Sequence, residues 1–178
     1  MLQQTATKTT DLAAVAVSIG PGSYTGLRVG LSAAKGFCYA LDIPLIAVGT
    51  LDMMAFAVKE EAAEFICAMI DARRMEVFTA LYDKNLRQIH APSAMIIDPQ
   101  RFSTALDKNK VLFCGNGSKK LQAILSHPNA SFSDTAMTSL HLSQIAHQYY
   151  RERKFDDLAY TEPLYIKEFF SPERKTIS

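Results

Sequence analysis

The sequence lacks any long apolar run and any strong excess of one charge. No segment approaches the ~18 uninterrupted apolar residues that a membrane-spanning helix needs. The first residues are polar, without the basic start and apolar core of a secretory signal. A formal net charge of +1 gives no general attraction to nucleic acid. Together with a hydrophobic fraction of 48%, these absences predict a globular cytoplasmic protein with no membrane partner.

Sequence motifs typical of metal sites are missing as well. Cys38, Cys67 and Cys114 are far apart and form no CxxC pair, so we expect buried free thiols rather than a zinc site or disulfides. His141 and His147 are too far apart in sequence for the i, i+4 spacing of a helical zinc site. No order of Ser, His and Asp stands out for nucleophilic catalysis. We therefore expect no metal site, no cofactor and no catalytic residue.

A glycine-rich turn, GPGSYTG, matches none of the common nucleotide or nucleophile motifs. It has no Gly-Lys-Ser/Thr end, its third glycine comes too late for a dinucleotide fingerprint, and Ser23 follows Gly22 directly. Two interpretations stay open. Gly20, Gly22, Ser23 and Thr25 could hold a phosphate at the start of a helix, or the glycines simply allow a sharp turn.

The order of elements predicts two lobes. The first part should contain a buried strand, central in a sheet, then a helix, a strand and a helix, over residues 12–19, 25–41, 44–49 and from Thr50 onward. This alternation favours parallel pairing. From about residue 62 the pattern changes to an antiparallel hairpin, followed by shorter strands and helices, over residues 65–71, 76–83, 86–91, 110–115, 119–126 and 139–153.

The helix over residues 25–41 has one narrow polar stripe. At about 100° per residue, five side chains fall close to one line: Arg28, Ser32, Lys35, Tyr39 and Asp42. The rest of the circumference is apolar, which is more than an ordinary surface helix carries. Leu27, Leu31 and Cys38 suit packing on a sheet.

The opposite apolar side of this helix is made mostly of small residues. Val29, Ala33, Gly36 and Ala40 would let another backbone approach closely, and Phe37 lies beside them. Either another helix of the same chain or a partner subunit could cover this side, and composition alone does not choose between them. These five residues are the candidate partner interface.

The densest charge cluster lies at the tip of the predicted hairpin, at Asp71, Arg73, Arg74 and Glu76. The simplest interpretation is a solvated tip with local ion pairs, each worth about 0–1 kcal/mol. Arg73 or Arg74 contacting a partner protein or the backbone of a tRNA is the alternative.

The stretch GPGSYTGLRVGLSAAKGFCYALDIPLIAVGTLDMMA closely resembles the TsaB (YeaZ) family of bacteria. IDARRMEVFTALYD and EPLYIK are similar to later motifs of that family, so the resemblance covers nearly the whole chain. It implies an α/β fold of the actin-like ATPase (sugar kinase/Hsp70) superfamily, with two ribonuclease H-like lobes and mixed sheets. Residues 1–61 would be the remainder of a truncated first lobe, and residues 62–178 the second lobe and C-terminal tail.

The resemblance also implies a function. Members of this family are non-catalytic scaffold partners of TsaD in the threonylcarbamoyl modification of adenosine next to the tRNA anticodon, together with the ATPase TsaE. The helix after the glycine turn forms homodimers in the absence of TsaD, or the heterodimer with TsaD, and tRNA is met through the complex. Family members begin with a strand and a phosphate turn that are not found here, so we expect the N-terminal region of the first lobe to be missing.

Two other classes of function remain open from the sequence. One is a degenerate or metal-independent peptidase, suggested by the "glycoprotease" label of the wider group. The other is a nucleotide-binding ATPase or kinase relative. The lack of a recognisable metal, nucleophile or Walker motif argues against both.

Overall fold

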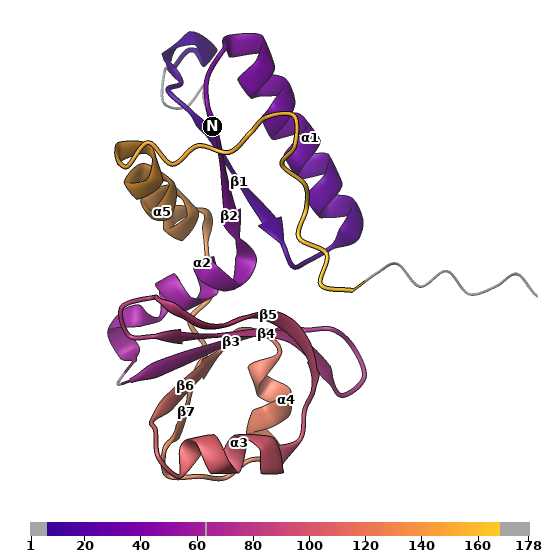
Figure 1. Cartoon of the computed structure of the whole chain (residues 1–178), viewed down its shortest axis with the longest axis vertical. Coiled ribbons are helices and arrows are strands. Elements are labelled where there is room, and N and C mark those ends of the chain that lie inside the picture. The colour runs from indigo at the N-terminus through magenta and orange to yellow at the C-terminus, as the bar shows by residue number, and fades with distance from the viewer. Residues whose placement is uncertain (1–6, 63, 168–178) are drawn as a thin grey trace, which may run out of the picture.

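A computed structural model describes residues 7–62 and 64–167. Figure 1 shows two lobes, each built on its own sheet, with the helix α2 (Thr50–Ala57) between them. The upper lobe in the figure carries the first sheet and the helices α1 (Tyr24–Leu41) and α5 (Ser139–Arg151). The lower lobe carries the second sheet with the helices α3 (Pro99–Leu106) and α4 (Ser118–Gln122).

The first sheet consists of the parallel strands β1 (Val15–Gly20) and β2 (Leu45–Gly49). The parallel pairing confirms the prediction from the alternation of strand and helix. The central position predicted for β1 is wrong for the described residues, because β2 is its one strand neighbour there. β1 is accordingly half-buried along most of its length, whereas Leu45, Ile46 and Val48 of β2 are buried.

The second sheet is mixed and has the strand order β5-β4-β3-β6-β7. Strands β3 (Phe65–Asp71) and β4 (Glu76–Asp83) form the predicted antiparallel hairpin. Three further strands complete the sheet: β5 (Gln88–Ile96) antiparallel to β4, β6 (Val111–Cys114) parallel to β3, and β7 (Ala130–Ser133) parallel to β6. The helix α3 was not predicted, and the strand predicted at residues 86–91 extends to Ile96.

Side-chain alternation in the second sheet makes two apolar cores, one on each face. One core joins Ile66, Ala68 and Tyr82 to Leu51 and Val58 of the α2 region. The other core lies under α3 and α4 and includes Cys67, Met69, Val77, Phe113 and Leu121. All three cysteines of the chain are buried free thiols, as predicted.

The chain returns to the first lobe near its end. Ile145 and Ala146 of α5 pack on Ile46, Val48 and Met53, so this helix covers one face of the first sheet. The segment after α5 then crosses to β2, where Asp156 N donates to Leu45 O at 2.9 Å. The packing therefore differs from the expected division at residues 61 and 62, because α5 and the segment up to Leu164 contact the first lobe.

Two short 3₁₀ helices complete the described elements, η2 (Thr9–Asp11) before β1 and η3 (Lys59–Glu61) after α2. No helix in the described part of the chain is long and apolar enough to cross a bilayer.

Candidate protein-interaction surface

The helix α1 is fixed to the first sheet by its larger apolar residues. Leu31, Ala34 and Cys38 are buried against Leu45 of β2 and the half-buried Val15 of β1. Ser23 caps the helix, since its Oγ accepts a hydrogen bond from Gly26 N at 3.3 Å. At the other end Asp42 adopts a left-handed conformation that closes the helix. The prediction that the Leu31 and Cys38 side faces the sheet is confirmed.

The opposite face of α1 is open to solvent. We call it the α1 apolar face, defined by Val29, Ala33, Gly36, Phe37 and Ala40, all of which are exposed. Val29 retains 64% and Phe37 50% of their accessible surface. A Cβ atom built on Gly36 would meet no atom within 4 Å. No element of the described residues covers this face, although it is made of apolar and small side chains.

The polar stripe of α1 has a different neighbour, the segment that follows α5. Arg28 Nε donates to Tyr165 Oη at 3.0 Å, and Lys35 Nζ donates to Ala159 O at 3.3 Å. The hydrogen bond to Tyr165 raises the pKa of Arg28. Figure 1 shows this segment running along α1. This segment therefore contacts Arg28 and Lys35 on the polar stripe of α1 and leaves the α1 apolar face free.

The same segment also holds the glycine turn. Leu164 N donates to Ile19 O at 2.7 Å, and the ring of Tyr165 lies 5.0 Å from that of Tyr24. Gly20 has φ +112°, and a Cβ atom there would lie 3.0 Å from Leu164 O. Only glycine fits such a position without strain. A structural role therefore accounts for Gly20, while phosphate binding at this turn stays a prediction.

The tip of the β3–β4 hairpin is held from below by Lys120 of α4. Its Nζ lies 2.5 Å from Asp71 Oδ1 and 2.5 Å from Arg74 O. This ion pair, with the hydrogen bond from Arg73 N, lowers the pKa of Asp71. Both arginines adopt left-handed backbone conformations, with φ of 69° and 49°, and both are exposed. The sequence pattern identified the cluster but missed Lys120, which is distant in sequence and pairs with Asp71 in place of either arginine.

A polar contact joins β4 of the second sheet to α2, the helix between the two lobes. Tyr82 Oη of β4 donates to Asp52 Oδ1 of α2 at 2.7 Å. Burial of the tyrosine, followed by the nearby Asp52 charge, raises the pKa of Tyr82. Within residues 7–62 and 64–167 there is no group of three or more His, Cys, Asp or Glu side chains placed to hold a metal ion.

A family model described as TsaD, tRNA N6-adenosine threonylcarbamoyltransferase, matches residues 1–168 of this chain. Among curated proteins, the tRNA threonylcarbamoyladenosine biosynthesis protein TsaB of Bacillus subtilis is 44% identical over 72 residues, covering 40% of this chain and 31% of that protein. The protein of the same name from Escherichia coli is 40% identical over 86 residues, covering 48% and 37%. These two alignments span about a third of each relative. The TsaB of Haemophilus influenzae aligns more widely, with 28% identity over 86% of this chain and 70% of that protein.

Solved structures agree with these sequence relatives. The structure titled YeaZ from Pseudomonas aeruginosa has a TM-score of 0.77 and 24% identity, and the match covers 93% of this chain and 79% of that one. A second structure, described as an uncharacterized protein with similarity to peptidase YEAZ from the same organism, has a TM-score of 0.77 and 23% identity. These matches confirm that the chain shares the fold of the YeaZ structures, an α/β architecture whose second sheet is mixed here.

Proposed function

Because this chain belongs to the TsaD family, and within that family to the TsaB (YeaZ) group, we propose that it is a scaffold partner of a TsaD protein. The modification would be the threonylcarbamoylation of adenosine next to the tRNA anticodon, carried out in the cytoplasm. In this proposal the chain supplies a binding surface and no catalytic group. TsaD is its direct partner, TsaE joins the complex, and tRNA is met through the complex.

The observation that carries the proposal is the α1 apolar face. A helix in water normally turns its apolar stripe inward and its polar side outward. Here the segment around Ala159 and Tyr165 contacts the polar stripe of α1, while Val29 and Phe37 on the apolar face remain 64% and 50% exposed. Burying such side chains against a partner is favourable by about 25 cal/mol per Å² of apolar surface. Gly36, with open space around its Cβ position, would let a partner helix approach closely.

An exposed aromatic residue next to the α1 apolar face also fits a protein interface. Tyr39 is 83% exposed at the border of the α1 apolar face, on the side of the polar stripe. Aromatic residues at the border of an apolar patch are common at protein interfaces. The same face would pair two copies of the chain when TsaD is absent, because a two-fold dimer uses one patch twice. Arg73 and Arg74 remain candidates for contact with tRNA or the partner.

Complex formation with TsaD from the same organism tests the proposal. We expect the wild-type chain and TsaD to elute together in size-exclusion chromatography. We expect Ala33→Glu and Gly36→Arg each to abolish this complex, because a charge would be buried without a partner. Both positions are exposed, so the far-UV circular dichroism of the variants should match that of wild type.

Matched controls place the same side chains on other exposed helical positions. Ala123→Glu at the end of α4 and Gln144→Arg on α5 change charge equally but lie away from α1. Both should retain the complex. Retention of the complex by Ala33→Glu and Gly36→Arg, or its absence in the wild-type chain, would contradict the proposal.

A further inference from the structure

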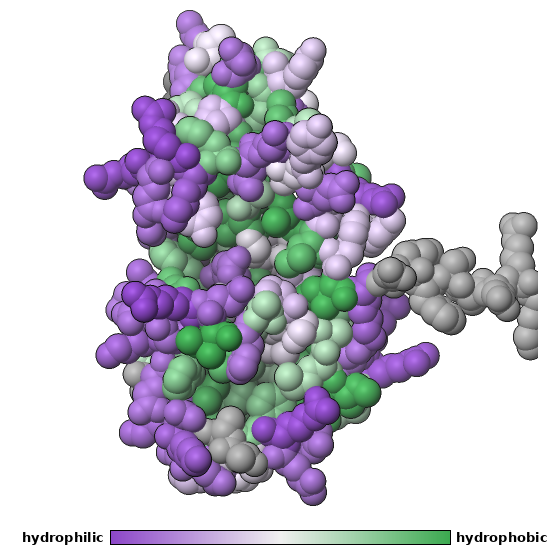
Figure 2. All heavy atoms as spheres, in the orientation of Figure 1, coloured by the Kyte–Doolittle hydropathy of each residue, from purple (hydrophilic) through white to green (hydrophobic). Residues whose placement is uncertain are grey.

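The second lobe contains a cavity of about 430 Å³ between its sheet and α3. This volume lies in the range of about 300–1,000 Å³ that small-molecule sites occupy. Its walls are mostly apolar and come from β3, β4, β5, β6 and α3, with Phe65, Leu81, Met95, Phe102, Val111 and Phe113 among them. On the viewed face of this lobe, the lower half of Figure 2, apolar residues lie among polar ones.

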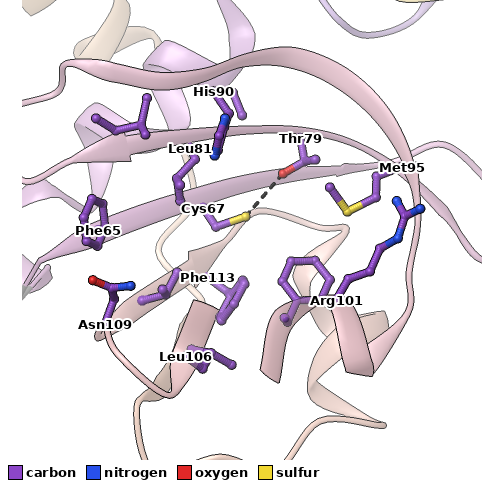
Figure 3. Close-up of a pocket in the computed structure, with 14 residues that line it drawn as sticks. Phe65, Cys67, Thr79, Leu81, His90, Met95, Arg101, Leu106, Asn109 and Phe113 are labelled. Atoms are coloured by element: carbon purple, nitrogen blue, oxygen red, sulfur yellow. Dashed lines mark hydrogen bonds between the residues drawn. The ribbon is translucent and has the colours of Figure 1, made fainter. Parts of the chain in front are cut away.

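The two polar side chains that β3 and β4 bring to the cavity, Cys67 and Thr79, hydrogen-bond to each other. Cys67 Sγ and Thr79 Oγ1 lie 3.3 Å apart and satisfy each other, as Figure 3 shows. Burial raises the pKa of the Cys67 thiol to about 11, so the thiol stays neutral. A molecule in contact with this wall must therefore be apolar, because a polar group placed there would lose its hydrogen bonds to water.

One cationic side chain, that of Arg101, lies at the rim. Arg101 of α3 and His90 of β5 both line the cavity and are exposed. In Figure 3 the Arg101 side chain extends from α3 to lie beside Met95. Within the described residues, neither side chain takes part in an ion pair or a hydrogen bond.

No carboxylate in the described part of the chain forms an ion pair with Arg101. The described residues that line the cavity include no aspartate or glutamate. Asp98, three positions before Arg101, accepts a hydrogen bond from Gln100 N at 3.0 Å. A guanidinium without a carboxylate partner, next to an apolar cavity, complements a ligand with an anionic head and an apolar body.

We propose that this cavity is a binding site for a medium-chain fatty acid. The alkyl chain lies between the sheet and α3, against Leu81, Phe102 and Phe113, and the carboxylate pairs with Arg101 at the rim. Each methylene group that enters the cavity should improve affinity about fourfold until the space is filled. The site is separate from the α1 apolar face and does not depend on the proposed function.

Titration of the full chain with decanoate below its micelle concentration tests the site. Isothermal titration calorimetry should show saturable binding, and methyl NMR signals of Leu81, Met95 and Val111 should shift while those of Val29 do not. Arg101→Gln should weaken decanoate binding by about tenfold or more, because a charge-assisted hydrogen bond is lost. Decanol, which has no charge, should bind wild type and Arg101→Gln equally.

Two further variants separate the site from nonspecific effects. Arg87→Gln removes an exposed arginine on the β4–β5 connection that does not line the cavity, and decanoate binding should be unchanged. Met95→Trp places a larger side chain in the cavity and should abolish binding of both decanoate and decanol, with circular dichroism checking that the chain is folded. The proposal is overturned if decanoate leaves the Leu81 and Met95 methyl signals unmoved, or if it binds Arg101→Gln as tightly as wild type.

Discussion

The sheets of the two lobes are covered by helices in different ways. The second sheet has five strands in the described residues, with α2 packed on one face and α3 and α4 on the other. The first sheet has two strands, held between α1 and α5. Yet α1 carries apolar side chains all around except for one stripe, and its buried residues, Leu31, Ala34 and Cys38, all lie on the side of the sheet.

This contrast shows where apolar surface serves the fold and where it remains available. In the second lobe apolar side chains such as Ile66 and Met69 are fully buried and support the fold alone. In the first lobe Val29 and Phe37 add nothing to the core because they face solvent. Apolar residues of the same type should thus differ in what their removal costs: stability when they lie in a core, association when they lie on the α1 apolar face.

The largest expected loss of stability comes from shortening a side chain in the core between the second sheet and α2. Leu112 of β6 is 5% exposed and shares a core with Leu51 of α2 and Ile66 of β3, so Leu112→Ala should lower the free energy of unfolding by about 2–5 kcal/mol. Val29→Ala, on the α1 apolar face, should change it by less than about 0.5 kcal/mol. Urea denaturation of both variants measures the difference. An equal loss of unfolding free energy in Leu112→Ala and Val29→Ala would contradict the distinction between core residues and the α1 apolar face.

A smaller effect is expected where the lobes meet. Tyr82→Phe removes the hydrogen bond to Asp52 and should lower the free energy of unfolding by roughly 1–3 kcal/mol near neutral pH. Burial raises the pKa of Tyr82 in the folded chain, so above the ordinary tyrosine pKa of about 10 the unfolded chain loses this proton first. Wild type should then lose stability with rising pH more steeply than Tyr82→Phe.

Urea denaturation of wild type and Tyr82→Phe at pH 8 and at pH 11 measures this slope. The comparison cancels the contribution of Cys67 and Cys114, whose pKa values are also raised by burial and are present in both chains. Identical slopes for the two chains would show that Tyr82 has the same pKa in the folded and the unfolded chain. That result would contradict a buried Tyr82 that donates a hydrogen bond to Asp52.

The smallest expected effect is at the start of α1. Ser23→Ala removes the N-cap hydrogen bond to Gly26 N and should cost about 1 kcal/mol of stability. Association through the α1 apolar face should be retained, because the cap does not belong to it. Ser23→Asp is the matched variant, since aspartate is also a good N-cap, and it should restore stability. A stability loss in Ser23→Asp equal to that in Ser23→Ala would argue against capping.

Much of the fold followed from periodicity in the sequence. The helix over residues 25–41, the parallel pair β1–β2 and the β3–β4 hairpin were predicted, because long periodic or alternating runs record which face is buried. The helix α3 was missed, because it is short and carries few apolar residues. The central position of β1 was predicted from its continuous apolar run, but a strand can also be half-covered by helices on both faces.

The candidate surfaces were predictable only in part. The α1 apolar face could be drawn on a helical wheel, but its exposure could not, because exposure depends on where the distant segment around Ala159 and Tyr165 lies. Lys120 was likewise missed at the hairpin tip, since nothing local links it to Asp71. The cavity between β4 and α3 has no sequence signature, because residues from five elements line it.

Site-specific photo-crosslinking tests the central claim most directly. A photoreactive amino acid replaces Ala33 on the α1 apolar face or, as the matched position, Ala123 at the end of α4, and each chain is illuminated with TsaD. We predict a covalent product with TsaD from position 33 and none from position 123. Crosslinking from position 123 alone, or equally from both positions, would contradict the account that α1 presents the partner surface.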